Sequence, residues 1–274
     1  MKDHLLSLAS GERDLGARLN LVREYVQAYI LRSFMEAGAF AGLAFHGGTA
    51  LRFLHGLRRF SEDLDFALER PEHDPGLLAL MKRVERDFKM SGYDIEISTR
   101  EQRTVHSAMA KFPALLHETG LSSVRGAKLN IRIEIDTHPP KGAVLETRLV
   151  TRHFPISFCA HDLRSCLSGK IHALLARRYT KGRDLFDLAW YLTHPSHPDP
   201  NLELLRNALQ QTKWSRPEVD ADNWRRILCD HVSLLKWDAV VRDVEPFLED
   251  PRDRQALDRQ LLLAELARSA TPDK

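Results

Sequence analysis

The stretch FHGGTALRFLHGLRRFSEDLDFAL, residues 45–68, joins a pair of glycines to an alternating Asp-Leu-Asp-Phe. Asp63 and Asp65 stand two residues apart, so in a strand both carboxylates share one face while Leu64 and Phe66 take the other. Two carboxylates side by side repel each other unless a cation neutralises them. The pair is therefore either a solvated strand face or a cation site. Mg²⁺ is the natural cation, because it prefers a few carboxylates with phosphate oxygens completing its shell.

The glycine pair lies between a predicted short buried strand and a helical pattern that begins near Thr49. Glycine lets the backbone approach a ligand closely, and the first amides of a helix favour phosphate. Thr49 offers a helix cap or a hydroxyl donor. Such a pair more often marks only a tight turn. Here, however, residues 49–62 are enough for a short helix that returns the chain from Gly48 to the strand of Asp63. The phosphate-binding glycines and the two carboxylates would then lie at the same end of a small sheet.

The composition is that of a globular protein without a strong charge bias. The 274 residues include 40 Lys and Arg against 38 Asp and Glu, a net charge of +2. This balance argues against a protein that coats polyanions, although local basic patches remain compatible with it. The three cysteines, Cys159, Cys166 and Cys229, form no CxxC pair and predict reduced thiols.

The same sequence shows no membrane or export signal. No apolar segment approaches the ~20 residues that a membrane helix needs. The apolar run near the N-terminus is too short for a secretory signal. We therefore expect a cytoplasmic protein with no membrane contact.

Apolar periodicity predicts alternating helices and strands in the first half of the chain. Helices are predicted over 17–38, 49–57 and 76–90, and strands over 61–68, 92–98, 128–137 and 144–150. The clearest strand, KLNIRIEIDT at 128–137, places four apolar side chains on one face and Asn130, Arg132, Glu134 and Asp136 on the other.

The second half of the chain changes to helical spacing. From Asp162 onward the predicted helices cover 162–178, 184–193, 201–212, 221–235, 237–249 and 253–268. A mixed sheet followed by helices predicts an α+β (α/β) protein. We expect an N-terminal domain over 1–158 and a helical C-terminal domain over 159–274.

The elements GGTAL and RFSEDLDF resemble the signature of nucleotidyltransferases of the polymerase-β-like superfamily. More narrowly, they resemble the AbiEii/AbiGii-type toxin group, which includes the MenT toxins. Gly48 stands where the superfamily usually has serine, which is the variant of the toxin group. The resemblance implies that Asp63 and Asp65 bind metal. The residues that it implies for nucleotide binding are Gly47, Gly48, Thr49 and Ser61 in the N-terminal domain, with Lys170 from the helical one.

The resemblance also requires a third acidic residue on a neighbouring strand. NIRIEID supplies Glu134 and Asp136 on one polar face. Glu134 is favoured as the third metal ligand because it lies in the strand interior, and Asp136 is the alternative. An exposed face of an edge strand would show the same pattern.

The stretch LSGKIHALLARRYTKGRDLFDLAWYL, residues 167–192, resembles the later motifs of the same group. Lys170 falls on an apolar stripe with leucines at helical spacing, where it either faces inward or extends from the edge of the stripe. The resemblance implies that Lys170 binds the β- and γ-phosphates and that Asp184 belongs to the active site. Asp184 would orient the lysine or act as a base, and Asp187 is the alternative.

Two groups of basic residues suit a phosphate-rich partner. Arg177, Arg178, Lys181 and Arg183 cluster around this motif, as expected for an RNA acceptor or for simple complementation of a helix dipole. Arg52 and Arg59, which flank the opening stretch, are predicted to contact the triphosphate or RNA.

The implied reaction is nucleotidyl transfer from an NTP that releases pyrophosphate, with two Mg²⁺ ions expected. For the toxin group the implied acceptor is the 3′ end of tRNA, whose extension would block aminoacylation and translation. A cognate antitoxin is the implied partner. The alternatives are transfer to a protein or small-molecule hydroxyl, or a non-catalytic nucleotide- or RNA-binding module of the same fold.

Overall fold

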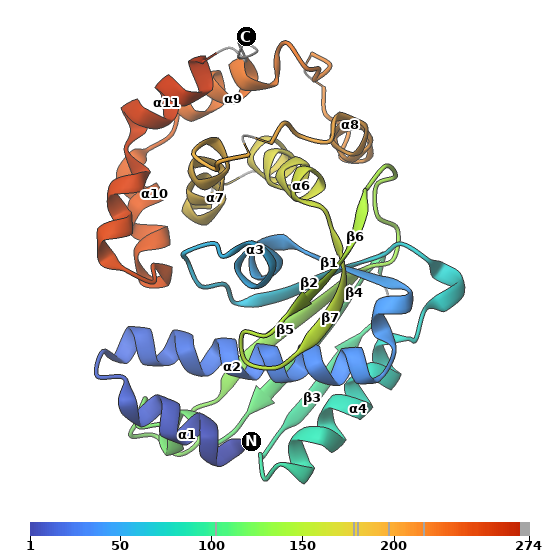
Figure 1. Ribbon diagram of the computed structural model, residues 1–274, viewed down its shortest axis with the longest axis vertical. Coiled ribbons are helices and arrows are strands. Elements are labelled where there is room, and N and C mark those ends of the chain that lie inside the picture. Colours follow the sequence, from blue (N-terminus) through green and yellow to red (C-terminus); the bar gives the residue numbers. More distant parts are fainter. Residues whose placement is uncertain (102, 178, 180, 197, 216, 269–274) are drawn as a thin grey trace. The chain divides into compact units, whose positions relative to one another are not determined.

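The computed structural model describes residues 1–101, 103–177, 179, 181–196, 198–215 and 217–268 (Figure 1). The chain divides into two compact units. The first contains residues 1–56, 60–139 and 145–160, and the second contains residues 57–59, 140–144 and 161–274. None of the described helices is long and apolar enough to cross a membrane.

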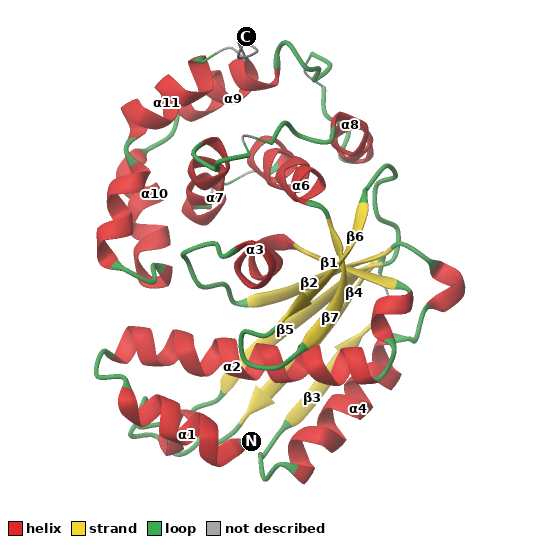
Figure 2. Ribbon diagram, in the orientation of Figure 1, coloured by secondary structure: helices red, strands yellow, loops and turns green. Residues whose placement is uncertain are grey.

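The first unit is built on a mixed sheet, which Figure 2 shows in yellow. The described residues form seven strands in the order β3-β4-β5-β2-β1-β7-β6. Their bounds are β1 Leu43–His46, β2 Asp63–Leu68, β3 Glu96–Arg100, β4 Val105–Phe112, β5 Leu129–Asp136, β6 Leu145–Val150 and β7 Ile156–His161. Strand β2 pairs antiparallel with β1 and parallel with β5, whereas β4 runs antiparallel to both β3 and β5.

Helices α2 (Leu15–Glu36) and α4 (Leu77–Met90) cover the apolar face of this sheet. Phe34 of α2 packs on Phe66 of β2 with ring centroids 5.3 Å apart, and Phe88 of α4 packs on Phe112 of β4 at 4.9 Å. Burial of these rings is what orients β2, because its alternation must place Leu64 and Phe66 in the core.

The remaining helices of the first unit are short. They are α1 (Lys2–Gly11), which packs on α2, then α3 (Gly47–His55), which contacts β1 and β2, and α5 (Leu115–Glu118). Single 3₁₀ turns cover Ala39–Ala41 and Pro71–His73.

The second unit consists of helices. Their bounds are α6 Leu163–Ala176, α7 Gly182–Leu192, α8 Leu202–Gln211, α9 Trp224–Ser233, α10 Trp237–Val244 and α11 Arg259–Ala267. Helix α6 packs on α7 and α8, α7 packs on α10, and α9 packs on α11. Gly182 is needed where α7 meets α10, because a Cβ there would lie 2.0 Å from the Val240 carbonyl oxygen.

The predicted fold class is confirmed, but the element predictions missed some segments. Strands β4 and β7 and helix α1 were not predicted. In β4 the buried positions include Ala108 and Ala110, whose small side chains give a weak alternation signal. The segment predicted as one helix over 253–268 is a 3₁₀ helix, Pro251–Leu257, followed by α11. The helix predicted over 237–249 ends at Val244, where Pro246 enforces a 3₁₀ turn.

Candidate functional site

The two aspartates of the opening stretch lie at the start of β2. Asp63 and Asp65 are half-buried, and Leu64 and Phe66 between and after them are buried. The structure thus places both carboxylates on the face of β2 that does not enter the core. This confirms the predicted orientation of the strand.

Strand β5 brings a third carboxylate beside them. In the parallel pairing of β2 with β5, Glu134 lies opposite Asp65, while Asp136 lies opposite Ala67. Residues that are paired across strands point to the same face, so Glu134 shares the face of the two aspartates. The register therefore puts Glu134 next to the aspartate pair, whereas Asp136 lies two residue pairs beyond it.

Gly47 allows the backbone to pass close to Asp65. A Cβ at Gly47 would lie 2.4 Å from the Asp65 Oδ2 atom, and the residue has φ +79°. Any side chain here would therefore displace the carboxylate and also strain the backbone. Gly47 and Gly48 form the first turn of α3, whose N-terminus lies beside β2. This placement is compatible with the predicted phosphate-binding role of the glycine pair.

Thr49 has a contact that the sequence did not predict. Its side chain is buried, and its hydroxyl donates a hydrogen bond to the backbone carbonyl of Asp63. The hydroxyl is thus engaged within the protein rather than directed at solvent. Thr49 connects the first turn of α3 to the first residue of β2.

Gln27 of α2 is a further residue at this site that the sequence analysis missed. Its buried side-chain amide donates to the carbonyls of Ser61, at 3.1 Å, and Glu62, at 2.9 Å. Together with Thr49 it holds three consecutive carbonyls immediately before and at the start of β2. Gln27 shares its helical face with the polar residues Asn20 and Glu24, so no break in an apolar stripe pointed to it. Ser61 itself is partly exposed in this loop.

The prediction for Arg52 and Arg59 is wrong, because both side chains are only 2% exposed. Arg52, on α3, pairs with Glu24 of α2 and lies over the ring of Phe60 at 3.8 Å. Spacing in the sequence could not show that both guanidinium groups point into the protein. Neither is available to a triphosphate or an RNA.

Glu24 is the centre of a buried ion cluster in the first unit. Arg152 approaches its carboxylate at 2.9 Å and His153 at 3.0 Å, in addition to Arg52. Burial raises the pKa of Glu24, but the hydrogen bond to His153 and the charges of Arg52 and Arg152 outweigh it and lower the pKa to about 2. The cluster anchors α3 to α2, and thereby the helix that begins at Gly47.

In the second unit, Lys170 of α6 faces inward, which is one of the two orientations that its place on the apolar stripe allowed. Its Nζ atom lies 3.0 Å from Asp184 Oδ1 and 2.7 Å from Asp187 Oδ2, both on α7. Burial lowers the pKa of Lys170, but the two carboxylates outweigh it, so the net shift is upward. Lys170 is therefore a fixed, protonated cation with 12% of its side chain exposed.

The two aspartates of α7 differ in their second partners. Asp187 is fully buried and accepts two hydrogen bonds from Arg59, each 2.6 Å long. Asp184 pairs instead with Arg177, which is 39% exposed. Burial raises the pKa of Asp184, but the charges of Lys170 and Arg177 outweigh this effect, so the net shift is downward. Asp187 thus has a structural partner, whereas Asp184 lies nearer to solvent.

The basic cluster predicted around this motif is divided in the structure. Arg177 forms an ion pair with Asp184, and the guanidinium of Arg183 lies 4.2 Å from the centre of the Phe247 ring. Lys181 is the N-cap residue of α7. Arg178 lies outside the described residues.

The residues on the polar face of the sheet fit a divalent metal by their chemistry. Asp63, Asp65 and Glu134 supply hard oxygen donors on adjacent strands, and Gly47 leaves the space beside Asp65 that a Cβ would fill. Among the described residues, no three His, Cys, Asp or Glu side chains are already gathered closely enough to hold an ion. Mg²⁺ usually takes one or two carboxylates plus phosphate and water, so a gathered cage is not required.

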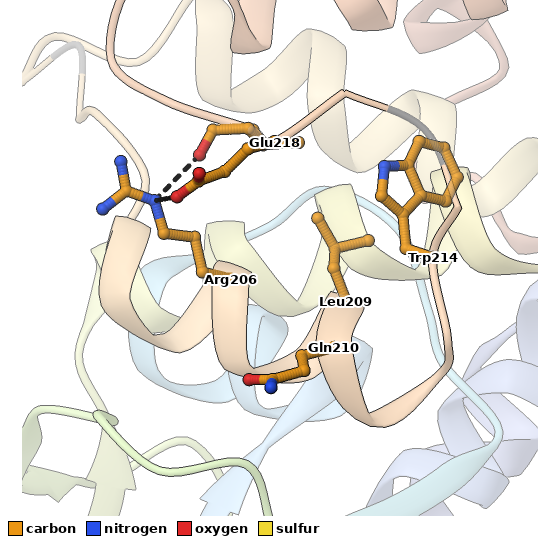
Figure 3. A pocket seen from close by; sticks show the side chains of 6 residues that line it. Arg206, Leu209, Gln210, Trp214 and Glu218 are labelled. Atoms are coloured by element: carbon orange, nitrogen blue, oxygen red, sulfur yellow. Dashed lines mark hydrogen bonds and ion pairs between the residues drawn. The ribbon is translucent and has the colours of Figure 1, made fainter.

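A pocket of about 300 Å³ lies in the second unit (Figure 3), and none of the predicted site residues of that unit lines it. Its lining residues are Arg206, Leu209, Gln210, Trp214, Glu218 and Val219. Arg206 closes one side by an ion pair with Glu218 at 3.3 Å. No motif of the sequence pointed to this pocket.

Comparison with known proteins decides the family. The family model "Nucleotidyl transferase AbiEii toxin, Type IV TA system" matches residues 29–259, which is most of the chain. This chain belongs to the AbiEii family. Members of the AbiEii family are nucleotidyltransferases of toxin–antitoxin systems, so the chain is a nucleotidyltransferase. The family implies a nucleoside triphosphate as substrate, a divalent metal and an antitoxin as partner.

Solved structures show the same fold. No curated protein matches the chain in sequence. JHP933 from Helicobacter pylori has a TM-score of 0.52 at 20% identity and covers 90% of this chain and 93% of its own. MenT4, a nucleotidyltransferase toxin from Mycobacterium tuberculosis H37Rv, has a TM-score of 0.55 at 16% identity and covers 97% and 94% respectively. At these identities the likeness is one of fold.

Proposed function

We propose that this AbiEii-family protein is a cytoplasmic toxin that transfers nucleotides from an NTP to the 3′ end of tRNA with Mg²⁺, and so blocks translation. The register of β2 with β5 is the observation that supports metal-dependent chemistry. It places Asp63, Asp65 and Glu134 on one face of the sheet, beside the N-terminus of α3. An adjacent set of hard carboxylate donors is what magnesium-assisted transfer of a nucleotide needs.

In the proposed reaction, a hydroxyl oxygen of the acceptor forms a bond to the α-phosphorus of the NTP. The bond from that phosphorus to the β-phosphate oxygen breaks, pyrophosphate leaves, and the hydroxyl proton passes to solvent. Asp63, Asp65 and Glu134 would hold the metal, which when bound neutralises the phosphate oxygens. The amides of Gly47 and Gly48 would bind phosphate at the positive end of α3.

Thr49 and Ser61 support this site through the backbone in the proposed scheme. Thr49 binds the Asp63 carbonyl, and the Ser61 carbonyl is bound by Gln27. Both contacts determine where β2 begins and therefore where Asp63 projects. Phosphoryl transfer depends mostly on positioning and on charge stabilisation, so contacts that fix the position of Asp63 would contribute to catalysis.

For Lys170 we propose the role of a fixed cation for the β- and γ-phosphates. Its raised pKa keeps it charged, and Asp184 and Asp187 hold its Nζ in one position. Asp184 would orient the lysine, because it contacts the ammonium and lies closer to solvent than Asp187 does. Asp187 would be a structural residue, given its bidentate pair with Arg59.

The test of the acceptor and the metal is a transfer assay. The full chain is incubated with bulk tRNA, Mg²⁺ and each labelled NTP in turn, and label is followed on RNA and on protein. We expect label on tRNA from the wild type and a loss of about a hundredfold or more for Asp63→Asn. Label that appears on protein, or transfer that survives Asp63→Asn, would contradict the proposal.

A matched pair of variants on β5 tests the third carboxylate in the same assay. Glu134→Gln removes the carboxylate opposite Asp65, whereas Asp136→Asn removes one on the same face opposite Ala67. We expect Glu134→Gln to lose activity as strongly as Asp63→Asn does. Asp136→Asn should stay close to the wild type. The reverse order would assign the metal to Asp136.

A further inference from the structure

Arg132 is a basic residue on the polar face of β5 that the nucleotidyl-transfer scheme does not use. In the register it lies opposite Asp63, two residue pairs before the pair of Glu134 with Asp65. Its Nη1 atom is 3.4 Å from Glu134 Oε1. The side chains of Arg132 and Glu134 are 54% and 35% exposed. A positive charge therefore lies within the set of carboxylates to which the metal is assigned.

The surrounding charges explain why a cation is favourable at this position. Asp63, Asp65 and Glu134 carry like charges on adjacent strands, and such neighbours destabilise each other. The guanidinium of Arg132 offsets part of this repulsion. Because both partners are exposed, the pair contributes at most about 1 kcal/mol and can be opened at little cost.

We propose that Arg132 is a displaceable counter-ion of Glu134, which competes with the divalent metal for that carboxylate and so sets the metal affinity of the site. The role rests on the proposed function, because it requires that Glu134 is a metal ligand. Where the metal binds Glu134, the guanidinium of Arg132 would be released beside the site. Its planar donors then suit the phosphate oxygens of the nucleotide.

The experiment measures Mn²⁺ binding to the full chain by calorimetry, without nucleotide or acceptor, so that no turnover is involved. Arg132→Met keeps the length of the side chain and removes the charge. It should bind Mn²⁺ about two- to fivefold more tightly than the wild type, the change expected for loss of an exposed ion pair. Arg132→Lys keeps the charge and should stay near the wild-type affinity.

Two further variants make the result specific. Lys128→Met removes an equally charged side chain that pairs with Glu96 at 2.7 Å just before β5 begins, and it should leave Mn²⁺ binding unchanged. Asp65→Asn should weaken Mn²⁺ binding by tenfold or more, roughly the effect of losing a metal-site residue. Circular dichroism would verify that each variant is folded.

The outcomes separate the counter-ion role from the metal site itself. If Asp65→Asn weakens binding but Arg132→Met binds like the wild type, the counter-ion role is wrong and the metal site stands. If Lys128→Met tightens binding as much as Arg132→Met, the effect is one of net charge and the specific role is also wrong. If the wild type and Asp65→Asn bind Mn²⁺ equally, both the metal assignment and the role of Arg132 are overturned.

Discussion

The hydroxyl of Thr49 donates a hydrogen bond to the backbone carbonyl of Asp63. The first turn of α3 is thereby bound to the first residue of β2. Both residues belong to the same short stretch of sequence, and the intervening chain leaves the sheet and returns to it. The contact is buried on the Thr49 side. This hydrogen bond explains how the glycine pair, which is the candidate phosphate site, is held at a fixed distance from Asp63, a candidate metal ligand.

Replacement of Thr49 by valine tests this contact. Thr49→Val keeps the shape of the buried side chain but removes the hydroxyl that donates to the Asp63 carbonyl, which should cost about 1–3 kcal/mol of unfolding free energy. Nucleotidyl transfer should fall as well, because Asp63 loses its support. Urea unfolding and the tRNA-labelling assay measure the two effects. Thr49→Ser retains the hydroxyl and should keep most of the activity. Equal activity of Thr49→Val and wild type would show that the contact does not position Asp63.

Gly47→Ala should damage the site more than Gly56→Ala does. Both glycines have a positive φ, +79° and +73°, so alanine strains the backbone by about 1–2 kcal/mol at either position. A Cβ at Gly56 meets no atom within 4 Å, whereas one at Gly47 meets the Asp65 carboxylate at 2.4 Å. We expect similar losses of thermal stability but a much larger loss of transfer activity for Gly47→Ala. Equal activity in the two variants would refute the close approach to Asp65.

Asp187→Asn should destabilise the protein far more than Asp184→Asn. Asp187 is fully buried and is shared by Arg59 and Lys170, so its neutralisation leaves a buried guanidinium poorly compensated. Loss of one partner of such a buried pair costs about 3–5 kcal/mol. Asp184→Asn leaves Lys170 paired with Asp187 and lets Arg177 turn to water. Denaturant unfolding compares the two variants, and equal destabilisation would contradict the structural role given to Asp187.

The buried Glu24 cluster predicts a loss of stability in acid. The pKa of Glu24 falls from 4.5 to about 2 on folding. Because the folded-state pKa is the lower one, the stabilisation is complete above pH 4.5 and is lost as the pH falls toward 2. The shift corresponds to on the order of 3 kcal/mol. Unfolding free energies between pH 6 and pH 3 should fall more steeply for the wild type than for Glu24→Gln. Parallel curves would show that Glu24 titrates normally.

Much of the candidate site could be predicted from local pattern. The alternation of DLDF and of NIRIEID shows which side chains share a face, because strand geometry has a period of two. The same argument at helical period put Lys170 on an inward stripe of α6. The family followed from the order of these motifs, and the match over residues 29–259 confirms it.

Other features depended on pairing between distant segments, which periodicity does not contain. The choice between Glu134 and Asp136 as the neighbour of Asp65 is a matter of strand register. The burial of Arg59 depends on Asp187, 128 residues later, and the loop before β2 is held by Gln27, 34 residues earlier. The sequence by itself determined which side chains are available on each face. Only the tertiary structure decided which of them meet, because a charge or a carbonyl finds its partner through packing of the whole chain.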